Sequence, residues 1–143
     1  MSTVHLKFDV APERIWAVLS DPTSYADWVV GSDSIRSADP HWPAPGSRFH
    51  HRVGTGPLKV RDHTEVLEAD PPHRLVLRAR ARPLGTARVE VRSTPDGAGT
   101  LVSLVETAAD PLTRLVLNRF SDSLLDRRNT EMLRRLKRLA ESD

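Results

Sequence analysis

Apolar residues recur at helical spacing over residues 110–141, and this segment contains neither Gly nor Pro after Pro111. Asp110 can cap a helix and Pro111 can occupy its first turn. The apolar stripe of the second half lies about 140° further round the helix than that of the first half. A straight helix of this length would be about 47 Å long, which exceeds the width of a compact domain of this size. The pattern therefore predicts a long helix with a kink or break between Asn118 and Ser123, the second half packing on a sheet.

The other face of this helical segment is charged. Five arginines lie there beside two acidic residues, a composition typical of a helix face in contact with water. We expect all seven side chains to be solvent-exposed: Arg127, Arg128, Arg134, Arg135 and Arg138 with Asp126 and Glu131.

Alternating apolar and polar residues predict strands over most of the remaining chain. Residues 3–10 form the first strand, the helical spacing of residues 11–19 predicts a short helix, and residues 25–29 suffice for only a turn or two of helix. Short Gly- and Pro-containing links between the later strands imply antiparallel neighbours. The result is an α+β fold, with a curved antiparallel sheet of about seven strands wrapped around the C-terminal helix. Its further strands are residues 32–38, 47–53, 58–69, 74–82, 86–93 and 101–107.

Alternation also predicts which side chains face the inside of the sheet. In residues 58–66 the inward set combines apolar residues with two polar ones, and in the next strand every arginine falls outside. The predicted inward residues of these two strands are Leu58, Val60, Asp62, Thr64 and Val66, then Leu75, Leu77, Ala79 and Ala81.

Two of the inward polar residues can form a proton-transfer pair. If Val53 pairs with Leu58 across the intervening turn, His51 and Asp62 become diagonal neighbours within reach of each other. A carboxylate partner raises the pKa of a histidine, so the pair could act as a general acid/base. The alternative is structural, with Asp62 satisfying a nearby backbone or Arg donor. Glu106 has the same two alternatives, a structural hydrogen bond or proton transfer.

Composition sets limits on other chemistry. The 143 residues are 38% apolar, which suits one domain spanning residues 1–143. The absence of cysteine excludes disulfides, thiolate metal sites and a Cys nucleophile. No apolar stretch is long enough to span a membrane and no signal peptide is evident, so we expect a cytoplasmic protein without membrane insertion. A net charge of +2 and few aromatic residues argue against a nucleic-acid partner.

The outer sheet face offers two further hypotheses. A row of arginines could bind an anionic partner, although Glu65 and Glu90 can neutralise part of it. His50 and His63 share this face, but two imidazoles without a matching carboxylate or thiolate make a poor metal site, and no metal is expected. The arginines are Arg74, Arg78, Arg80, Arg82, Arg88 and Arg92.

Several local motifs, in this order along the chain, resemble one known family. The chain is similar to the SRPBCC group of the START-like superfamily, also called polyketide cyclase/dehydrase, which has the helix-grip fold. The resemblance spans nearly the whole chain. Its carriers are VAPERIW at 10–16, LSDP at 19–22, YADW at 25–28, PGSRF at 45–49, EADPPHRL at 68–75, GTLVSL at 99–104 and LRRLKRL at 133–139.

The resemblance implies a pocket between the sheet and the long helix, and no cofactor. It places Tyr25, Trp28 and Trp42 on segments that cap the pocket mouth. Composition does not decide which alternate residues of the last strand face inward, and the resemblance favours the set that contains Glu106. The competing sets are Leu101, Ser103 and Val105 against Val102, Leu104 and Glu106.

The leading hypothesis is therefore a monomer or dimer that binds a hydrophobic or aromatic small molecule in this cavity. One alternative is a polyketide aromatase/cyclase or dehydratase using His51 and Asp62, although no inward Arg on the central strands and only one Tyr depart from the cyclase pattern. Another is an interaction module that uses the outer arginines. The expected ligand-binding residues are Tyr25, Trp28, Trp42, Phe49, His51, Val60, Asp62, Thr64, Leu75, Leu77, Ala79, Leu104, Glu106, Phe120 and Leu124.

Overall fold

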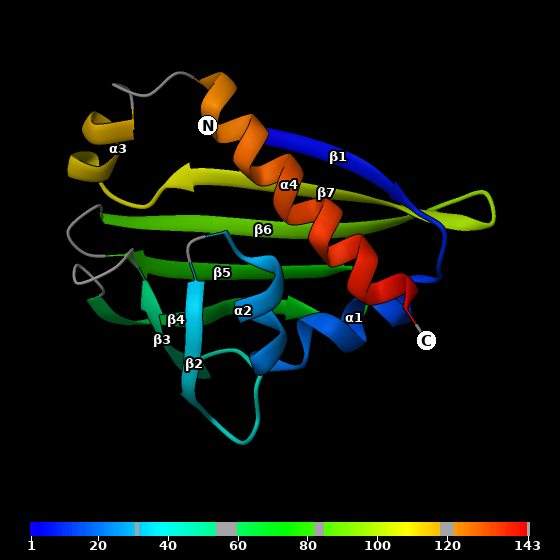
Figure 1. Cartoon of the computed structure of the whole chain (residues 1–143), viewed down its shortest axis with the longest axis horizontal. Helices are drawn as coiled ribbons and strands as arrows, with labels where there is room; N and C mark the ends of the chain where they lie inside the picture. Colours follow the sequence, from blue (N-terminus) through cyan, green and yellow to red (C-terminus); the bar gives the residue numbers. More distant parts are fainter. Residues whose placement is uncertain (31, 54–59, 82–84, 118–121, 143) are drawn as a thin grey trace.

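A single antiparallel sheet of seven strands forms the body of the molecule (Figure 1). The computed structural model describes residues 1–30, 32–53, 60–81, 85–117 and 122–142. The strands lie in the order β1-β7-β6-β5-β4-β3-β2, so the first strand pairs with the last. Their bounds are β1 Ser2–Phe8, β2 Ser32–Ala38, β3 Arg48–Val53, β4 Val60–Asp70, β5 Arg74–Ala81, β6 Gly85–Asp96 and β7 Gly99–Ala108.

Helices precede and follow the strands of the sheet. Between β1 and β2 lie α1 (Pro12–Leu19), the 3₁₀ turn η1 (Pro22–Ser24) and α2 (Tyr25–Trp28). Pro12 opens α1, where a missing N–H costs nothing, and the Asp21 side chain accepts the Thr23 N–H to start η1. Both short helices were predicted, and the seven strands and C-terminal helix confirm the predicted helix-grip fold.

The long C-terminal segment forms two helices, α3 (Pro111–Leu117) and α4 (Asp122–Glu141). The predicted interruption falls at this junction, where residues 118–121 lie outside the described part of the chain. α4 runs obliquely across one face of the sheet, whereas α3 lies at the end of the sheet where β7 finishes (Figure 1). Met132, Leu133, Leu136 and Ala140 of α4 are buried, which is the predicted packing of the second half on the sheet.

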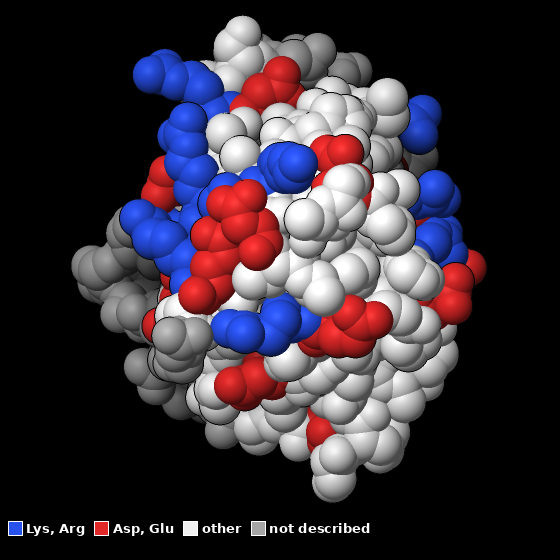
Figure 2. Space-filling view, turned by 90° about the vertical axis from the view of Figure 1, so that its right-hand side faces the viewer, with Lys and Arg blue, Asp and Glu red and all other residues white. Residues whose placement is uncertain are grey.

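The core lies between α4, α1 and the inner face of the sheet. Phe8, Ile15, Leu133 and Leu136 are almost completely buried there. At the right-hand end of Figure 1, charges are paired over this core, with Lys7 beside Asp96 and Lys137 beside Asp9 and Glu141. Figure 2 shows acidic and basic side chains next to each other on this end of the molecule.

The strand register keeps the predicted faces but corrects the predicted pairing. Val53 pairs with Val60 and not with Leu58, so His51 lies directly opposite Asp62 rather than diagonal to it. The hairpin link is two residues longer than expected, and a shift of two leaves every side chain on the same face. Phe49 correspondingly lies opposite Thr64.

Candidate functional site

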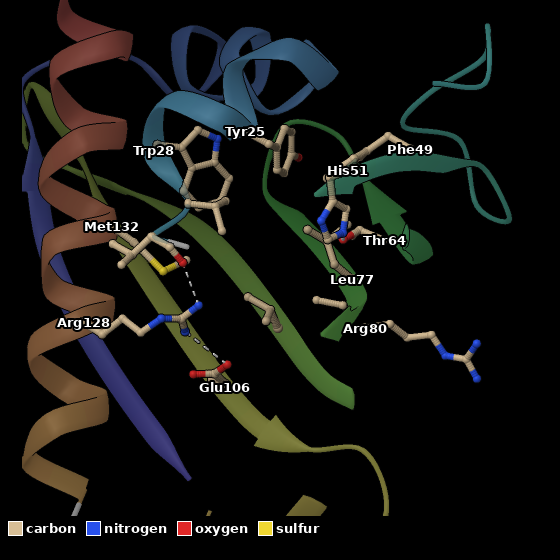
Figure 3. Close-up of a pocket in the computed structure, with 14 residues that line it drawn as sticks. Tyr25, Trp28, Phe49, His51, Thr64, Leu77, Arg80, Glu106, Arg128 and Met132 are labelled. Carbon is tan, nitrogen blue, oxygen red and sulfur yellow. Dashed lines mark hydrogen bonds and ion pairs between the residues drawn. The ribbon is translucent and has the colours of Figure 1, made fainter. Parts of the chain in front are cut away.

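A pocket lies between α4, the α2–β2 segment and the inner face of β3 to β7 (Figure 3). Its walls are mostly apolar, and its volume is about 90 Å³. Alternation along each strand turns the lining side chains to the same face of the sheet. The lining residues are Tyr25, Trp28, Val29, Val30, Phe49, His51, Thr64, Leu77, Ala79, Arg80, Val89, Glu106, Arg128 and Met132.

Aromatic rings form the wall nearest α2. Tyr25 stands 4.9 Å from Trp28 and 4.8 Å from Phe49, measured between ring centroids. The Tyr25 hydroxyl donates to the Leu19 carbonyl at 2.8 Å, and burial raises its pKa far above the ordinary value. The hydroxyl is thus used in an internal hydrogen bond, and Tyr25 contributes only its aromatic ring to the pocket.

His51 and Thr64 form one polar position in the pocket. Both are about 5% exposed, and the His51 Nε2 lies 3.1 Å from the Thr64 hydroxyl oxygen. They come from neighbouring strands, β3 and β4, whose inner faces carry them side by side. Figure 3 shows the imidazole pointing into the pocket. The ring can therefore exchange a hydrogen bond or a proton with a group bound beside it.

Glu106 and Arg128 form a second polar position (Figure 3). Arg128 donates to the Val30 carbonyl at 3.0 Å and lies 3.6 Å from a Glu106 carboxylate oxygen. The buried Asn129 amide donates to the other Glu106 oxygen and to the Ser2 hydroxyl, both at 3.1 Å. The cluster joins β1, β7, α4 and the α2–β2 segment, and it places a guanidinium against the pocket.

The structure brings eight of the fifteen predicted ligand-binding residues to this pocket, while four others pack elsewhere and one is exposed. Asp62 accepts the His63 N–H at 2.9 Å and Trp42 donates its indole N–H to Leu19, so both serve other contacts. The residues at the pocket are Tyr25, Trp28, Phe49, His51, Thr64, Leu77, Ala79 and Glu106; those buried away from it are Trp42, Asp62, Leu75 and Leu104, and Leu124 is 54% exposed. The Val60 side chain and Phe120 lie outside the described residues.

Arg128 corrects an expectation, because the sequence pattern placed it on the solvent face of α4. It lies four residues before the buried Met132, so both project from the same side of the helix toward the pocket. That spacing was the available signal. Arg80 also lines the pocket, at its rim, although its strand position is on the outside. The remaining residues not predicted are Val29, Val30, Val89 and Met132.

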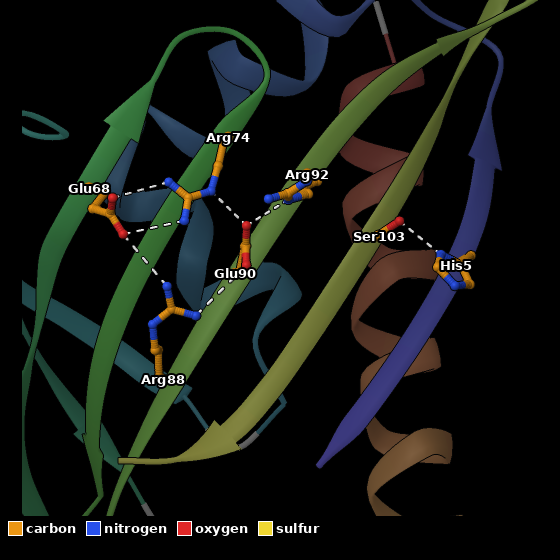
Figure 4. Close-up of polar contacts among 7 residues, drawn as sticks. All are labelled: His5, Glu68, Arg74, Arg88, Glu90, Arg92 and Ser103. Atoms are coloured by element: carbon orange, nitrogen blue, oxygen red, sulfur yellow. Dashed lines mark hydrogen bonds and ion pairs between the residues drawn. The ribbon is translucent and has the colours of Figure 1, made fainter.

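The outer sheet face carries an ion-pair network (Figure 4). Glu90 accepts the Arg74 Nε–H at 2.6 Å and the Arg92 Nε–H at 2.7 Å. Glu68 accepts from Arg74 at 3.2 and 3.3 Å, and Arg88 lies 3.6 Å from Glu68 and 3.7 Å from Glu90. The arginines that suggested an anionic partner are thus largely engaged within the sheet.

These contacts also set the pKa values of the outer carboxyls. The Arg92 hydrogen bond holds the pKa of Glu90 below its usual value, and the Arg48 hydrogen bond does the same for Glu65. Burial lowers the pKa of His63, with Arg48 adding to the effect. His50 and His63 stand 6.1 Å apart between ring centroids. In the described part of the chain, no group of three or more His, Asp or Glu residues could hold a metal ion.

The described helices include none that is both long and apolar enough to cross a bilayer. No curated protein matches the chain.

Solved structures share this fold at low sequence identity. Protein CV1439 from Chromobacterium violaceum is 19% identical, with a TM-score of 0.73 over 99% of this chain and 97% of that one. A protein from Arthrobacter aurescens is 16% identical, with a TM-score of 0.74 over 96% of this chain and 84% of that one. The di-domain ARO/CYC StfQ from the steffimycin biosynthetic pathway is 14% identical, with a TM-score of 0.73 over 97% of this chain and 49% of that one.

A family model described as polyketide cyclase/dehydrase and lipid transport matches residues 2–141. That range includes every strand of the sheet and the whole of α4. The chain therefore belongs to the polyketide cyclase/dehydrase and lipid transport family.

Proposed function

We propose that the protein binds a small apolar or aromatic molecule in the pocket between α4 and the sheet. The observation that carries this proposal is the division of the lining into a continuous apolar wall and two separate polar positions. Apolar walls supply burial, and a few fixed polar groups orient the ligand. His51 with Thr64 suits one oxygen or nitrogen of the ligand, and Arg128 suits an acceptor oxygen at the other position.

The pocket volume limits the size of the ligand. A cavity of about 90 Å³ is smaller than the ~150 Å³ cavity that accepts benzene in another protein. A ligand larger than one ring therefore requires the walls to move outward. Met132 is an unbranched side chain that adapts to different shapes, so we expect the α4 wall to give way first.

Native mass spectrometry of the purified protein tests this proposal directly. The spectrum is compared with that of a denatured sample, and an organic extract is analysed for any released molecule. We expect an apolar or aromatic species to be retained, or a thermal shift with small aromatic probes such as naphthol. A protein that is empty and shows no shift with any such probe would contradict the proposal.

Filling the pocket should weaken binding without unfolding the protein. Ala79 lines the pocket, whereas Ala98 is exposed in the β6–β7 turn. Ala79→Phe should weaken binding about tenfold or more, since overfilling a packed site costs about 1–3 kcal/mol. Ala98→Phe adds the same phenyl group to the surface and should leave affinity unchanged. Calorimetric titration with the retained ligand or the best probe measures both, and equal affinities would contradict the assignment of this pocket.

A second candidate is a cyclase or dehydratase, and two observations favour it. The family description names these activities, and the ionisable His51 points into the pocket. In this candidate His51 moves a proton during aldol closure or dehydration of a β-keto chain held by the apolar wall. His51→Gln should then abolish turnover of a β-keto thioester probe while leaving its affinity nearly unchanged. Equal turnover by both proteins would reject His51 as the proton-transfer group.

A further inference from the structure

Two leucines of α3 are exposed to solvent although they are large and apolar. Leu112 is 72% exposed and Leu115 is 59% exposed. Three residues apart on a helix, they project from the same side, with the exposed Arg114 between them in sequence. α3 lies at the end of the sheet, against β6 and β7 (Figure 1). Its outer side therefore presents a small apolar surface to the surroundings.

A basic hollow adjoins the start of α3. Its volume is about 340 Å³, and its lining is mainly polar. Ala109 and Asp110, which directly precede α3, form one side of it, and residues of β3 to β6 form the rest. The other lining residues are Arg48, His63, Arg78, Arg80 and Thr86.

The hollow has more positive than negative charge. Arg48 and Arg78 share one carboxylate, Glu65, at 2.7 and 3.2 Å. Arg80 is exposed and makes no ion pair with the described residues, and its guanidinium points away from the ligand pocket in Figure 3. The one acidic residue among those that line the hollow is Asp110. An anionic group would therefore find a guanidinium available here.

We propose that this end of the molecule, defined by Leu112, Arg114 and Leu115 with the basic hollow, docks on the surface of a bilayer containing anionic lipids. The two leucines would enter the boundary between headgroups and acyl chains, and the hollow would receive a lipid phosphate. The two leucines match the acyl-chain layer of such a bilayer, and the basic hollow matches its layer of anionic headgroups. Peripheral docking of this kind needs no membrane-spanning helix.

Arg80 connects this surface with the ligand pocket, because it lines both. Docking would therefore bring the rim of the pocket close to the bilayer, where apolar molecules are concentrated. An apolar ligand could then pass between bilayer and pocket with little exposure to water. The docking itself does not depend on the ligand, so the two proposals can fail independently.

Vesicle co-sedimentation tests the docking proposal. The purified chain is mixed with vesicles of phosphatidylcholine alone or of phosphatidylcholine with phosphatidylglycerol, at low and high salt. We expect binding only to the anionic vesicles and weaker binding at high salt. Leu112→Ser with Leu115→Ser should abolish it, and Arg80→Ser should weaken it about fivefold, the usual effect of one basic residue near such a surface.

Arg138→Ser is the matched control, because it removes the same charge from an exposed site near the far end of α4. Leu112→Ser alone is a second leucine variant, and its thermal unfolding should match that of the parent since the side chain is exposed. No binding to anionic vesicles would overturn the proposal. So would an equal loss with Arg138→Ser, which indicates unspecific charge attraction, or full binding by the double leucine variant. Binding to polyglutamate but not to vesicles would assign the surface to an acidic protein instead.

Discussion

Arg128 joins three parts of the chain through one side chain. Its guanidinium holds the Val30 carbonyl and faces Glu106, so α4, β7 and the α2–β2 segment meet at this residue. A hydrogen bond from a charged donor contributes more than one between neutral groups. The arginine therefore contributes both to the pocket wall and to the docking of α4 on the sheet.

Replacing this arginine should lower stability by a measurable amount. Arg128→Met keeps an unbranched side-chain stem but removes the hydrogen bond to the Val30 carbonyl and the cation beside Glu106. Because Arg128 is 39% exposed, we expect a loss of only about 1–2 kcal/mol in the free energy of unfolding. Arg127→Met changes an exposed neighbour and should have almost no effect. Urea unfolding of both variants measures the change in the free energy of unfolding. Equal losses in the two variants would show that Arg128 has no special role.

At the scale of single residues, the sequence predicted inward side chains better than their contacts. His51, Thr64 and Ala79 reach the pocket because alternation along a strand has only two outcomes. Trp42 and Asp62 were predicted there but form other hydrogen bonds, which depend on loops and on backbone donors that no pattern reveals. Arg128 was missed because charge was taken to indicate solvent, although its spacing from Met132 indicates the buried side.

At the scale of elements, the β6–β7 hairpin depends on two glycines. Gly97 has φ +59° in the two-residue turn, a conformation that residues other than glycine rarely adopt. Gly99 has a different role, since a Cβ there would collide with the Phe8 carbonyl oxygen of the neighbouring β1. The close approach of β1 to β7 thus requires a residue without a side chain.

Gly99→Ala should therefore destabilise the protein although alanine is a conservative change. The backbone must shift to relieve the collision, and overpacking of this kind costs about 1–3 kcal/mol. Ala98→Ser, at an exposed position of the same turn, should cost almost nothing, because it requires no unusual backbone conformation. Thermal unfolding by circular dichroism compares them. A melting temperature for Gly99→Ala equal to that of the parent would contradict this account.

The hairpin between β3 and β4 shows which part of an element can be predicted. The two strands and their inner faces follow from alternation, but their register depends on a turn whose length the composition does not fix. The predicted pairing of Val53 with Leu58 was wrong by two residues, which moved His51 opposite Asp62. An error of one residue would have turned every predicted pocket residue of the shifted strand outward.

For the whole molecule, the ion-pair network on the outer face makes stability depend on pH. The pKa values of Glu65, Glu68 and Glu90 are lowered in the folded state by arginine hydrogen bonds, so their stabilisation is present above about pH 4.5 and is lost as the pH falls through the folded values. The pKa of His63 is also lowered, mainly by burial, so the unfolded chain takes up its proton first. Both effects reduce stability on acidification.

We therefore expect the melting temperature to be constant near neutral pH, to fall slightly below about pH 6.5 and to fall steeply below about pH 4.5. His63→Asn should remove the first decrease and leave the second. Glu90→Gln should reduce the second decrease, because one paired carboxylate is gone. Differential scanning calorimetry over this pH range measures all three proteins. A melting temperature that rises on acidification would contradict the assignment.

The pairing of the first strand with the last also governs the order in which this fold can be completed. Phe8 pairs with Thr100 and Ser2 with Glu106, so β1 has no strand partner until the chain has been made as far as β7, which ends at Ala108 of the 143 residues. Closing so long a loop is entropically expensive and slows folding relative to that of proteins with local contacts. During synthesis, the first strand leaves the ribosome early and must wait for the seventh. Only then can α4, the last element made, cover the sheet and complete the walls of the pocket.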